Sequence, residues 1–228
     1  MAPPTEGRLD VPGHGTVAWR FLRPTDATVL LVLAHGAGTS LHHDFLEGLC
    51  RALCDHGVAT FRYNFPYREG RGWPPDRPPV LQATVRAAVT RAAELEPGLP
   101  LLAGGKSLGG RMTSSAAAEA PLAGVQGIVF VGFPLHPRGK PATERADHLA
   151  EVGLPMLFLQ GTRDRLAEVD LLRRVVADLQ PEPTLHVVEG ADHGFEVLKR
   201  SGRTEAEVVE ELAGAVAGWW GRPPSRVP

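Results

Sequence analysis

The feature that most constrains the fold of this chain is a regular alternation of short apolar runs with amphipathic stretches. Each run suits one strand and each stretch suits one helix. Strands that are apolar along nearly their whole length, with helices between them, form mostly parallel sheets covered by helices on both faces. The sequence therefore predicts an α/β fold, with strands at 28–36, 58–65, 99–104, 125–133, 154–161 and 184–190 and helices at 41–56, 80–96, 108–120, 166–179 and 203–220.

A β-hairpin is expected before this alternation, because the runs RLDV and GTVAWRFLRP flank a turn that starts at Pro12. No linker or repeat divides the 228 residues, of which 43% are hydrophobic. We expect one domain over 1–228, with its core at about 15–220 and a frayed tail at 221–228. Only about 20 positions separate two strands at 134–154, too few for a large helical lid.

The overall charge does not point to a partner, and any charged partner would have to be bound by a local patch. The formal net charge of −2 provides no general attraction to nucleic acid or to an anionic membrane. No secretory signal and no apolar run of roughly 20 residues is visible, so a cytoplasmic protein is expected. Cys50 and Cys54 lie four residues apart on one expected helix, a spacing that suits packing better than a disulfide.

The stretch LLAGGKSLGG at 101–110 permits two interpretations, a phosphate-binding loop or a turn that presents a nucleophilic serine. A phosphate-binding loop needs a glycine five residues before its Gly-Lys-Ser, and Pro100 stands there. The alternative is the G-x-S-x-G pattern from Gly105 to Gly109, between an expected strand and an expected helix. Such a turn holds Ser107 in a strained conformation above the sheet, so Ser107 is the candidate nucleophile.

Two further residues complete a candidate catalytic set. Asp164 follows the strand LPMLFLQG, and His193 follows the next strand along the chain. The carboxyl ends of parallel strands meet at one sheet edge, so both side chains are expected near Ser107. Asp192 is the main rival acid, but it adjoins His193 and is expected to point elsewhere. The order serine, acid, histidine is that of a hydrolase triad.

The motifs HGAG, RYNFPYREG, GGKSLGGRM, FPLHP, GTRD and ADHGF together resemble the alpha/beta hydrolases, and within them a small dienelactone-hydrolase-like group. The resemblance covers about residues 15 to 220. It implies an alpha/beta-hydrolase fold and a serine hydrolase without metal or organic cofactor. It also implies that the backbone N–H groups of Ala37 and Leu108 form the oxyanion hole.

The resemblance leaves the substrate open. Dienelactone hydrolases proper use a cysteine nucleophile, so lactone hydrolysis is not carried over to Ser107. We expect a small ester, thioester or related acyl substrate in a shallow, open site, and no nucleic-acid or membrane partner. The alternative is a hydrolase fold that serves mainly as a binding or scaffold protein, because the resembling group includes a subunit of a histone acetyltransferase complex.

Several residues around the expected site lie outside the candidate catalytic set. His35 is expected to hold the oxyanion loop by hydrogen bonding, and Lys106 and Arg111 to form ion pairs with nearby acids. The loop RYNFPYREGRGWPPDRPP mixes arginines with aromatic residues. This mixture suits a solvated loop, contact with a carboxylate-bearing substrate or, least of the three, binding of a single-stranded nucleic acid. The candidate substrate contacts are Phe65, Tyr67, Trp73 and His136.

Overall fold

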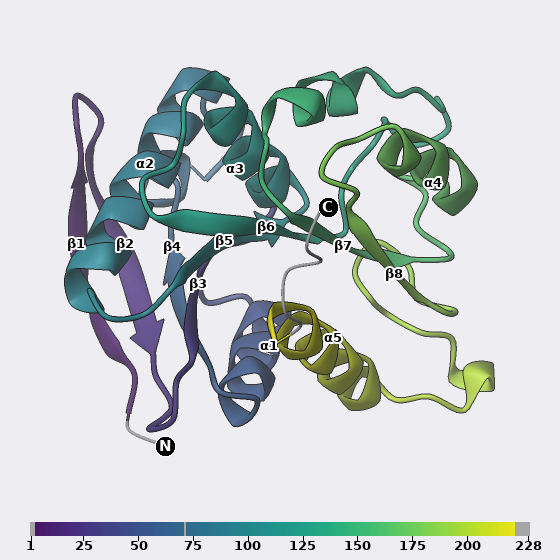
Figure 1. Cartoon of the computed structure of the whole chain (residues 1–228), viewed down its shortest axis with the longest axis horizontal. Helices are drawn as coiled ribbons and strands as arrows, with labels where there is room; N and C mark the ends of the chain where they lie inside the picture. The colour runs from purple at the N-terminus through teal and green to yellow at the C-terminus, as the bar shows by residue number, and fades with distance from the viewer. Residues whose placement is uncertain (1–2, 71, 222–228) are drawn as a thin grey trace, which may run out of the picture.

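The fold is built on one eight-stranded sheet (Figure 1). The computed structural model describes residues 3–70 and 72–221. The strand order is β1-β2-β4-β3-β5-β6-β7-β8; β2 is antiparallel to both β1 and β4, and all other neighbours are parallel. The strands are β1 (Thr5–Val11), β2 (Gly15–Leu22), β3 (Val29–Ala34), β4 (Val58–Tyr63), β5 (Leu101–Lys106), β6 (Val125–Val131), β7 (Met156–Gly161) and β8 (Thr184–Val188).

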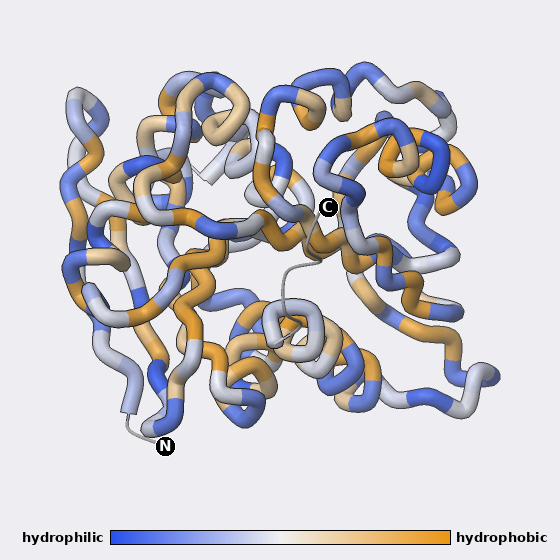
Figure 2. The backbone as a smooth tube through the Cα atoms, in the orientation of Figure 1, coloured by the Kyte–Doolittle hydropathy of each residue, from blue (hydrophilic) through white to orange (hydrophobic). Residues whose placement is uncertain are grey.

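Helices cover both faces of this sheet, as the sequence predicts. Figure 1 places α2 and α3 on one face and α1 and α5 on the other, and α4 packs on the face of α2 and α3. Figure 2 shows the central strands as the most hydrophobic part of the chain. The helices are α1 (Asp44–Asp55), α2 (Pro78–Leu95), α3 (Leu108–Glu119), α4 (Val169–Ala177) and α5 (Glu205–Trp220), and the short 3-10 helices are η1 (Pro66–Arg68), η2 (Glu144–Glu151) and η3 (Lys199–Ser201).

The expected hairpin is confirmed by β1 and β2, whose last pair joins Val11 to Gly15. Gly13 and Gly15 adopt positive φ angles of 76° and 81°, which side-chain-bearing residues rarely accept. The hairpin adds the two outer strands on the β4 side of the sheet. The opposite edge, formed by β6, β7 and β8, is parallel and carries the candidate acid and histidine on the loops that follow β7 and β8.

Helices α1 and α4 both begin three residues later than the sequence predicts. The Leu41 N–H donates to Asn64 Oδ1 at 2.9 Å, so the chain before α1 is held by the loop after β4. The Leu166 N–H donates to Asp164 Oδ1 at 2.7 Å, which keeps the chain before α4 in a turn. Both bonds use donors that a helix would have left free or engaged within itself.

The connection between β6 and β7 contains only η2 within the described residues, so no large lid covers the carboxyl edge of the sheet. None of the described helices combines the length and the apolar character that a membrane-spanning segment needs. Cys50 and Cys54 are buried and unbridged on α1, as expected. The tail expected at 221–228 lies outside the described residues except for Gly221.

Candidate active site

Ser107 occupies the sharp turn between β5 and α3. Its φ of 51° and ψ of −114° lie outside the regions that residues other than glycine ordinarily occupy. Such strain persists only where the surrounding structure fixes the backbone, and it gathers at functional sites. The turn directs the Ser107 hydroxyl above the carboxyl edge of the sheet.

The glycines around Ser107 allow the backbones to approach closely. A Cβ on Gly105 would lie 2.7 Å from the Ala34 carbonyl oxygen, and a Cβ on Gly109 would lie 2.6 Å from the same atom. Contacts under about 3 Å with backbone atoms cannot be relieved by moving a side chain. The strand and the helix that flank Ser107 therefore need glycine at both positions, which is the physical reason for the G-x-S-x-G pattern.

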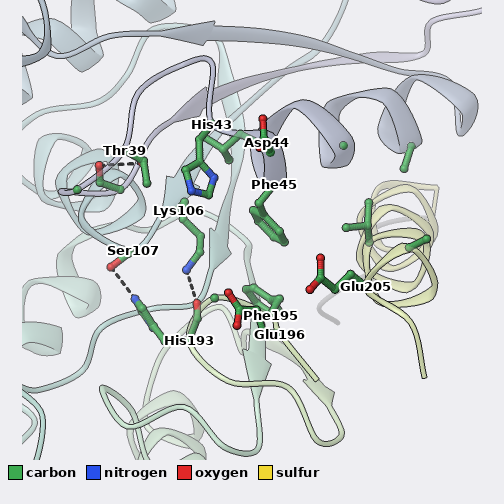
Figure 3. Close-up of a pocket in the computed structure, with 18 of the residues that line it drawn as sticks. Thr39, His43, Asp44, Phe45, Lys106, Ser107, His193, Phe195, Glu196 and Glu205 are labelled. Carbon is green, nitrogen blue, oxygen red and sulfur yellow. Dashed lines mark hydrogen bonds between the residues drawn. The ribbon is translucent and has the colours of Figure 1, made fainter. Parts of the chain in front are cut away.

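The structure brings the three candidate catalytic side chains into one hydrogen-bonded chain. His193 Nε2 lies 2.8 Å from Ser107 Oγ (Figure 3), and His193 Nδ1 lies 2.6 Å from Asp164 Oδ2. With Nδ1 protonated, the imidazole donates to the carboxylate and Nε2 is free to accept the serine hydroxyl proton. The Asp164 side chain is completely buried, whereas a quarter of the His193 side chain is exposed.

Asp164 is held by more than His193. The buried Gln160 side chain donates from Nε2 to Asp164 Oδ2 at 2.5 Å and accepts the Phe133 N–H at its Oε1 at 3.0 Å. Sequence reasoning missed Gln160, although a glutamine inside the apolar run LPMLFLQG was a visible signal. Asp192, the rival acid, instead accepts backbone N–H groups of its own turn, including that of Gly194 at 2.8 Å.

Hydrogen bonds of His35 and Tyr67 hold the loop that contains Ala37, the expected oxyanion donor. His35 is fully buried; its Nε2 accepts the Phe65 N–H at 3.1 Å and its Nδ1 lies 2.7 Å from the Gly36 carbonyl oxygen. Burial lowers the pKa of His35 to about 4, so the ring is neutral at pH 7. Tyr67 Oη donates to the Ala37 carbonyl oxygen at 2.8 Å. His35 thus holds this loop by hydrogen bonding, as expected.

The two expected oxyanion donors are unengaged. Within residues 3–70 and 72–221, neither the Ala37 N–H nor the Leu108 N–H has a protein acceptor. Leu108 is the first residue of α3, where backbone N–H groups have no partner inside the helix. Both groups are therefore available to a ligand.

Lys106 lies next to Ser107 in sequence but points at the loop after β8. Its Nζ donates to the His193 carbonyl oxygen and lies 5.4 Å from the centre of the Phe195 ring (Figure 3). Burial lowers the pKa of Lys106 to about 8, while the carboxylates of Asp164 and Asp192 oppose this shift. The expected ion pair is therefore replaced by a bond to a backbone carbonyl, which positions the loop that carries His193.

Arg111 also departs from expectation. None of the described acidic side chains lies within ion-pair distance of it, and its Nε has no acceptor. Arg111 does not line the cavity that contains Ser107; after burial, its charge is the next cause that lowers the pKa of His148.

A cavity of about 870 Å³ opens beside Ser107 and runs between α1 and α5. The rings of Phe45 and Phe195 stack in it, with their centres 5.6 Å apart and their planes at 7° to each other (Figure 3). Val209 of α5 also lines the cavity. Phe195, which adopts a positive φ of 67°, is one of the lining residues. The volume of the cavity is within the range of small-molecule sites. The cavity can therefore accommodate an apolar group attached to the atom that reacts with Ser107.

The four residues expected to contact substrate are not in this cavity. Phe65 and His136 are fully or almost fully buried, and Tyr67 is only 6% exposed. Trp73 is 65% exposed on the loop before α2. Phe65 and Tyr67 pack around His35 instead, at ring-centre distances of 5.1 and 5.8 Å. Within the described chain, the aromatic residues of the cavity are Phe45 and Phe195.

A second serine–histidine contact occurs away from the cavity. Ser114 Oγ of α3 lies 2.7 Å from His148 Nε2, and Ser114 is fully buried. No described carboxylate accepts a hydrogen bond from His148.

No group of three potential metal ligands occurs among the described residues.

Comparison with known proteins places the geometry in a family context. A family model described as an alpha/beta hydrolase domain matches residues 27–221. A Mycobacterium tuberculosis protein named "Putative phosphoribosyl transferase" is 28% identical over 221 residues, which are 94% of this chain. The chain spans only 44% of that relative's length.

Solved structures share the fold at low identity. A dienelactone hydrolase from Anabaena variabilis gives a TM-score of 0.76 at 22% identity, covering 95% of this chain and 97% of that one. A serine hydrolase without a lid from Xanthomonas campestris gives 0.74 at 21% identity, covering 98% of both chains. A ferulic-acid-bound protein from Butyrivibrio proteoclasticus gives 0.68 at 15% identity, covering 90% and 97%. These likenesses confirm the predicted fold.

Proposed function

We propose, from the premise that the chain belongs to the alpha/beta hydrolase family, that it is a serine hydrolase that cleaves an ester, thioester or related acyl bond of a small substrate. Ser107 is the proposed nucleophile, His193 the general base and acid, and Asp164 the group that orients the imidazole. The names of the similar solved structures, a dienelactone hydrolase and a lidless serine hydrolase among them, support hydrolysis as the reaction class.

The observation that carries this proposal is the continuous hydrogen-bonded chain from Ser107 Oγ through His193 to Asp164 Oδ2, starting at a strained backbone position. Activation of a serine needs a base within hydrogen-bond reach and a third group that orients the base. Both conditions are met at one sheet edge, together with the strained backbone of Ser107. A binding or scaffold protein has no chemical need for them.

The proposed reaction balances in two steps. In the first, the Ser107 oxygen bonds to the acyl carbon as its proton passes to His193 Nε2; the bond from that carbon to the leaving group breaks, and Nε2 gives the leaving group this proton. In the second, water gives a proton to Nε2 and bonds to the acyl carbon, and the bond to Ser107 breaks as that proton returns to the serine. The imidazolium formed in each step is stabilised by the Asp164 carboxylate.

The oxyanion of each tetrahedral intermediate needs donors that are already in place. The free N–H groups of Ala37 and Leu108 are the proposed donors. The brace of His35 and Tyr67 beneath the Ala37 loop keeps that donor fixed before substrate binds. Loss of one such donor typically lowers kcat by about 10²–10³-fold.

The test is covalent labelling of the purified protein by a fluorophosphonate probe, measured by intact mass. We expect one probe per chain in the wild type and none in Ser107→Ala or His193→Ala. The matched control is Ser114→Ala, which removes the other serine with a histidine partner and is expected to label like the wild type. A folded wild-type protein that takes up no probe would favour the alternative of a binding or scaffold protein.

A further inference from the structure

A second recess, of about 430 Å³, opens on the other side of His193. It is bounded by the loops that follow β6, β7 and β8. Three arginines face it, one from the first loop and two from the second, together with the turn that carries His193. The residues that line it are Arg138, Arg163, Arg165, Leu166, Asp192 and His193.

The position of the recess relative to Ser107 gives it a place in the reaction. The recess and the large cavity share His193 and Leu166, but only the large cavity includes Ser107 and Ala37. The acyl carbon and its oxyanion therefore lie on the cavity side. Because His193 gives its proton to the departing atom, the leaving group lies next to the imidazole. The recess is the space into which that group extends.

The charge of the recess is unbalanced. None of the described acidic side chains forms an ion pair with its three arginines, although Arg163 donates to the Gly190 carbonyl oxygen at 2.9 Å. Asp192 is the only carboxylate in the lining, and its Oδ1 already accepts the N–H groups of Gly194 and Glu196. The recess therefore offers guanidinium groups whose matching anion is not supplied by the described part of the chain.

The large cavity has the opposite character. Its floor is apolar, with the stacked rings of Phe45 and Phe195, and its rim carries more acidic than basic side chains. An anionic group is therefore disfavoured on that side of Ser107 and favoured on the other. The acidic residues of the lining are Asp44, Asp55, Glu196 and Glu205, the basic ones are Arg51 and Lys106, and the histidines are His43 and His193.

We infer that the leaving group of the substrate carries a phosphate or carboxylate that binds in the recess of Arg138, Arg163 and Arg165, while an apolar acyl group occupies the cavity between α1 and α5. This inference rests on the proposed function, since it assigns the two halves of the cleaved substrate to the two sides of His193. Specificity for the charged half then comes from electrostatics, and specificity for the acyl half from shape.

The experiment compares two butanoate esters with the same acyl group. One has 4-hydroxybenzoate as its leaving group and the other has 4-hydroxybenzamide, which is similar in shape but neutral. The double variant Arg138→Gln/Arg165→Gln removes two guanidinium groups that make no hydrogen bond within the described chain, and it keeps Arg163 with its bond to Gly190. We expect it to lower kcat/KM for the benzoate ester by about tenfold, mainly through KM, and to leave the benzamide ester within about twofold.

A matched control separates a local effect from a change of net charge. Lys140 lies on the same loop as Arg138 and is exposed, but it does not line the recess. Lys140→Gln is expected to leave the ratio of the two kcat/KM values at its wild-type value. A ratio that changes equally in both variants would overturn the inference, because general electrostatic attraction would then explain the preference.

Two further results separate failure of this inference from failure of the proposed function. If the wild type cleaves both esters and the double variant has the same ratio, the leaving-group assignment is wrong and the serine hydrolase stands. If neither ester is cleaved but Ser107 takes up the fluorophosphonate, inorganic phosphate and benzoate are each tested for slowing that labelling. If an anion slows labelling of the wild type but not of the double variant, the result supports anion binding in the recess and tells which anion the recess prefers. If neither anion slows labelling, the inference is overturned. If the folded protein takes up no fluorophosphonate, both proposals fail.

Discussion

Two serine–histidine contacts in the described part of the chain have nearly the same distance but different surroundings. Ser107 lies 2.8 Å from His193 Nε2, and Ser114 lies 2.7 Å from His148 Nε2. Both serines belong to the segment that forms α3 and its turn. Judged by that distance alone, either serine is a candidate nucleophile.

The surroundings separate the two. Ser107 has a positive φ, lies beside a cavity, and faces a histidine that is hydrogen-bonded to the buried carboxylate of Asp164. Ser114 lies inside a regular helix and is fully buried, and its histidine has no carboxylate acceptor in the described chain. A histidine base within reach is therefore not sufficient. Catalysis also needs a third group that orients the histidine, N–H donors for the oxyanion and access for the substrate.

Removal of the third group is expected to have the largest effect. Asp164→Asn keeps the shape of the residue but favours the wrong tautomer of His193, so kcat should fall by about 10⁴-fold. The counterpart is Asp147→Asn, which removes the exposed carboxylate next to His148 and should leave kcat within about twofold. The kcat of both variants is measured with the butanoate ester of 4-hydroxybenzamide. A loss of less than tenfold in Asp164→Asn would break the comparison.

The second largest expected effect is a pH dependence of stability that comes from Lys106, whose buried ammonium lies next to Ser107 in sequence. The pKa of Lys106 is lowered to about 8 in the folded chain, below its usual value of 10.5, so the unfolded chain binds more protons between these two pH values. Stability is therefore reduced below pH 8 and recovers as the pH rises towards 10.5, by at most about 1.4 kcal/mol per pH unit. Urea unfolding from pH 7.5 to 10 should show this rise in the wild type relative to Lys106→Met. Equal slopes in the two proteins would contradict it.

Backbone strain provides a third test, in which the two serines should respond with opposite signs. Ser107→Gly relieves a positive φ of 51° and is expected to raise the free energy of unfolding by about 1 kcal/mol while abolishing activity. Ser114→Gly places a glycine inside α3 and should lower it by about 1 kcal/mol or more. Urea denaturation of both variants measures the difference. A destabilised Ser107→Gly would indicate that the hydrogen bond to His193 outweighs the strain.

The smallest expected effect concerns His148. Burial, and then the charge of Arg111, lower its pKa below 6.5, so the unfolded chain binds more protons at mildly acidic pH. The wild type should therefore lose stability as the pH falls through 6.5, and His148→Gln should lose less. Thermal unfolding between pH 7.5 and 5.5 compares the two. A steeper loss in the variant would assign the acid sensitivity to another group.

The candidate catalytic residues were visible in the sequence because each follows a strand of one parallel sheet. Strand order need not be known for that argument, since all carboxyl ends of such a sheet lie on the same edge. Ser107, Asp164 and His193 are each within five residues of the end of a strand, so small errors in the element boundaries do not move them off that edge. The glycine pattern around Ser107 added a second, local signal.

The aromatic lining of the cavity beside Ser107 could not be predicted in the same way. Phe65 and Tyr67 lie on a loop whose course depends on bonds to distant residues, including the Tyr67 N–H to Asp76 Oδ2 at 2.8 Å and Tyr67 Oη to Ala37. These bonds turn the aromatic rings inward against His35. Phe45 and Phe195 come from segments 150 positions apart and meet only because α1 and the loop after β8 lie side by side. No local pattern carries that information.

The burial of the two native cysteines makes position 107, that of the proposed nucleophile, a unique site for thiol chemistry. Cys50 and Cys54 are the only cysteines of the chain; both are buried, and burial raises the pKa of both thiols. A Ser107→Cys variant would therefore present a single reactive sulfur, beside an imidazole that can deprotonate it. A spectroscopic label, a crosslinker or a trapped acyl thioester could then be attached at one known atom, without first removing any other cysteine.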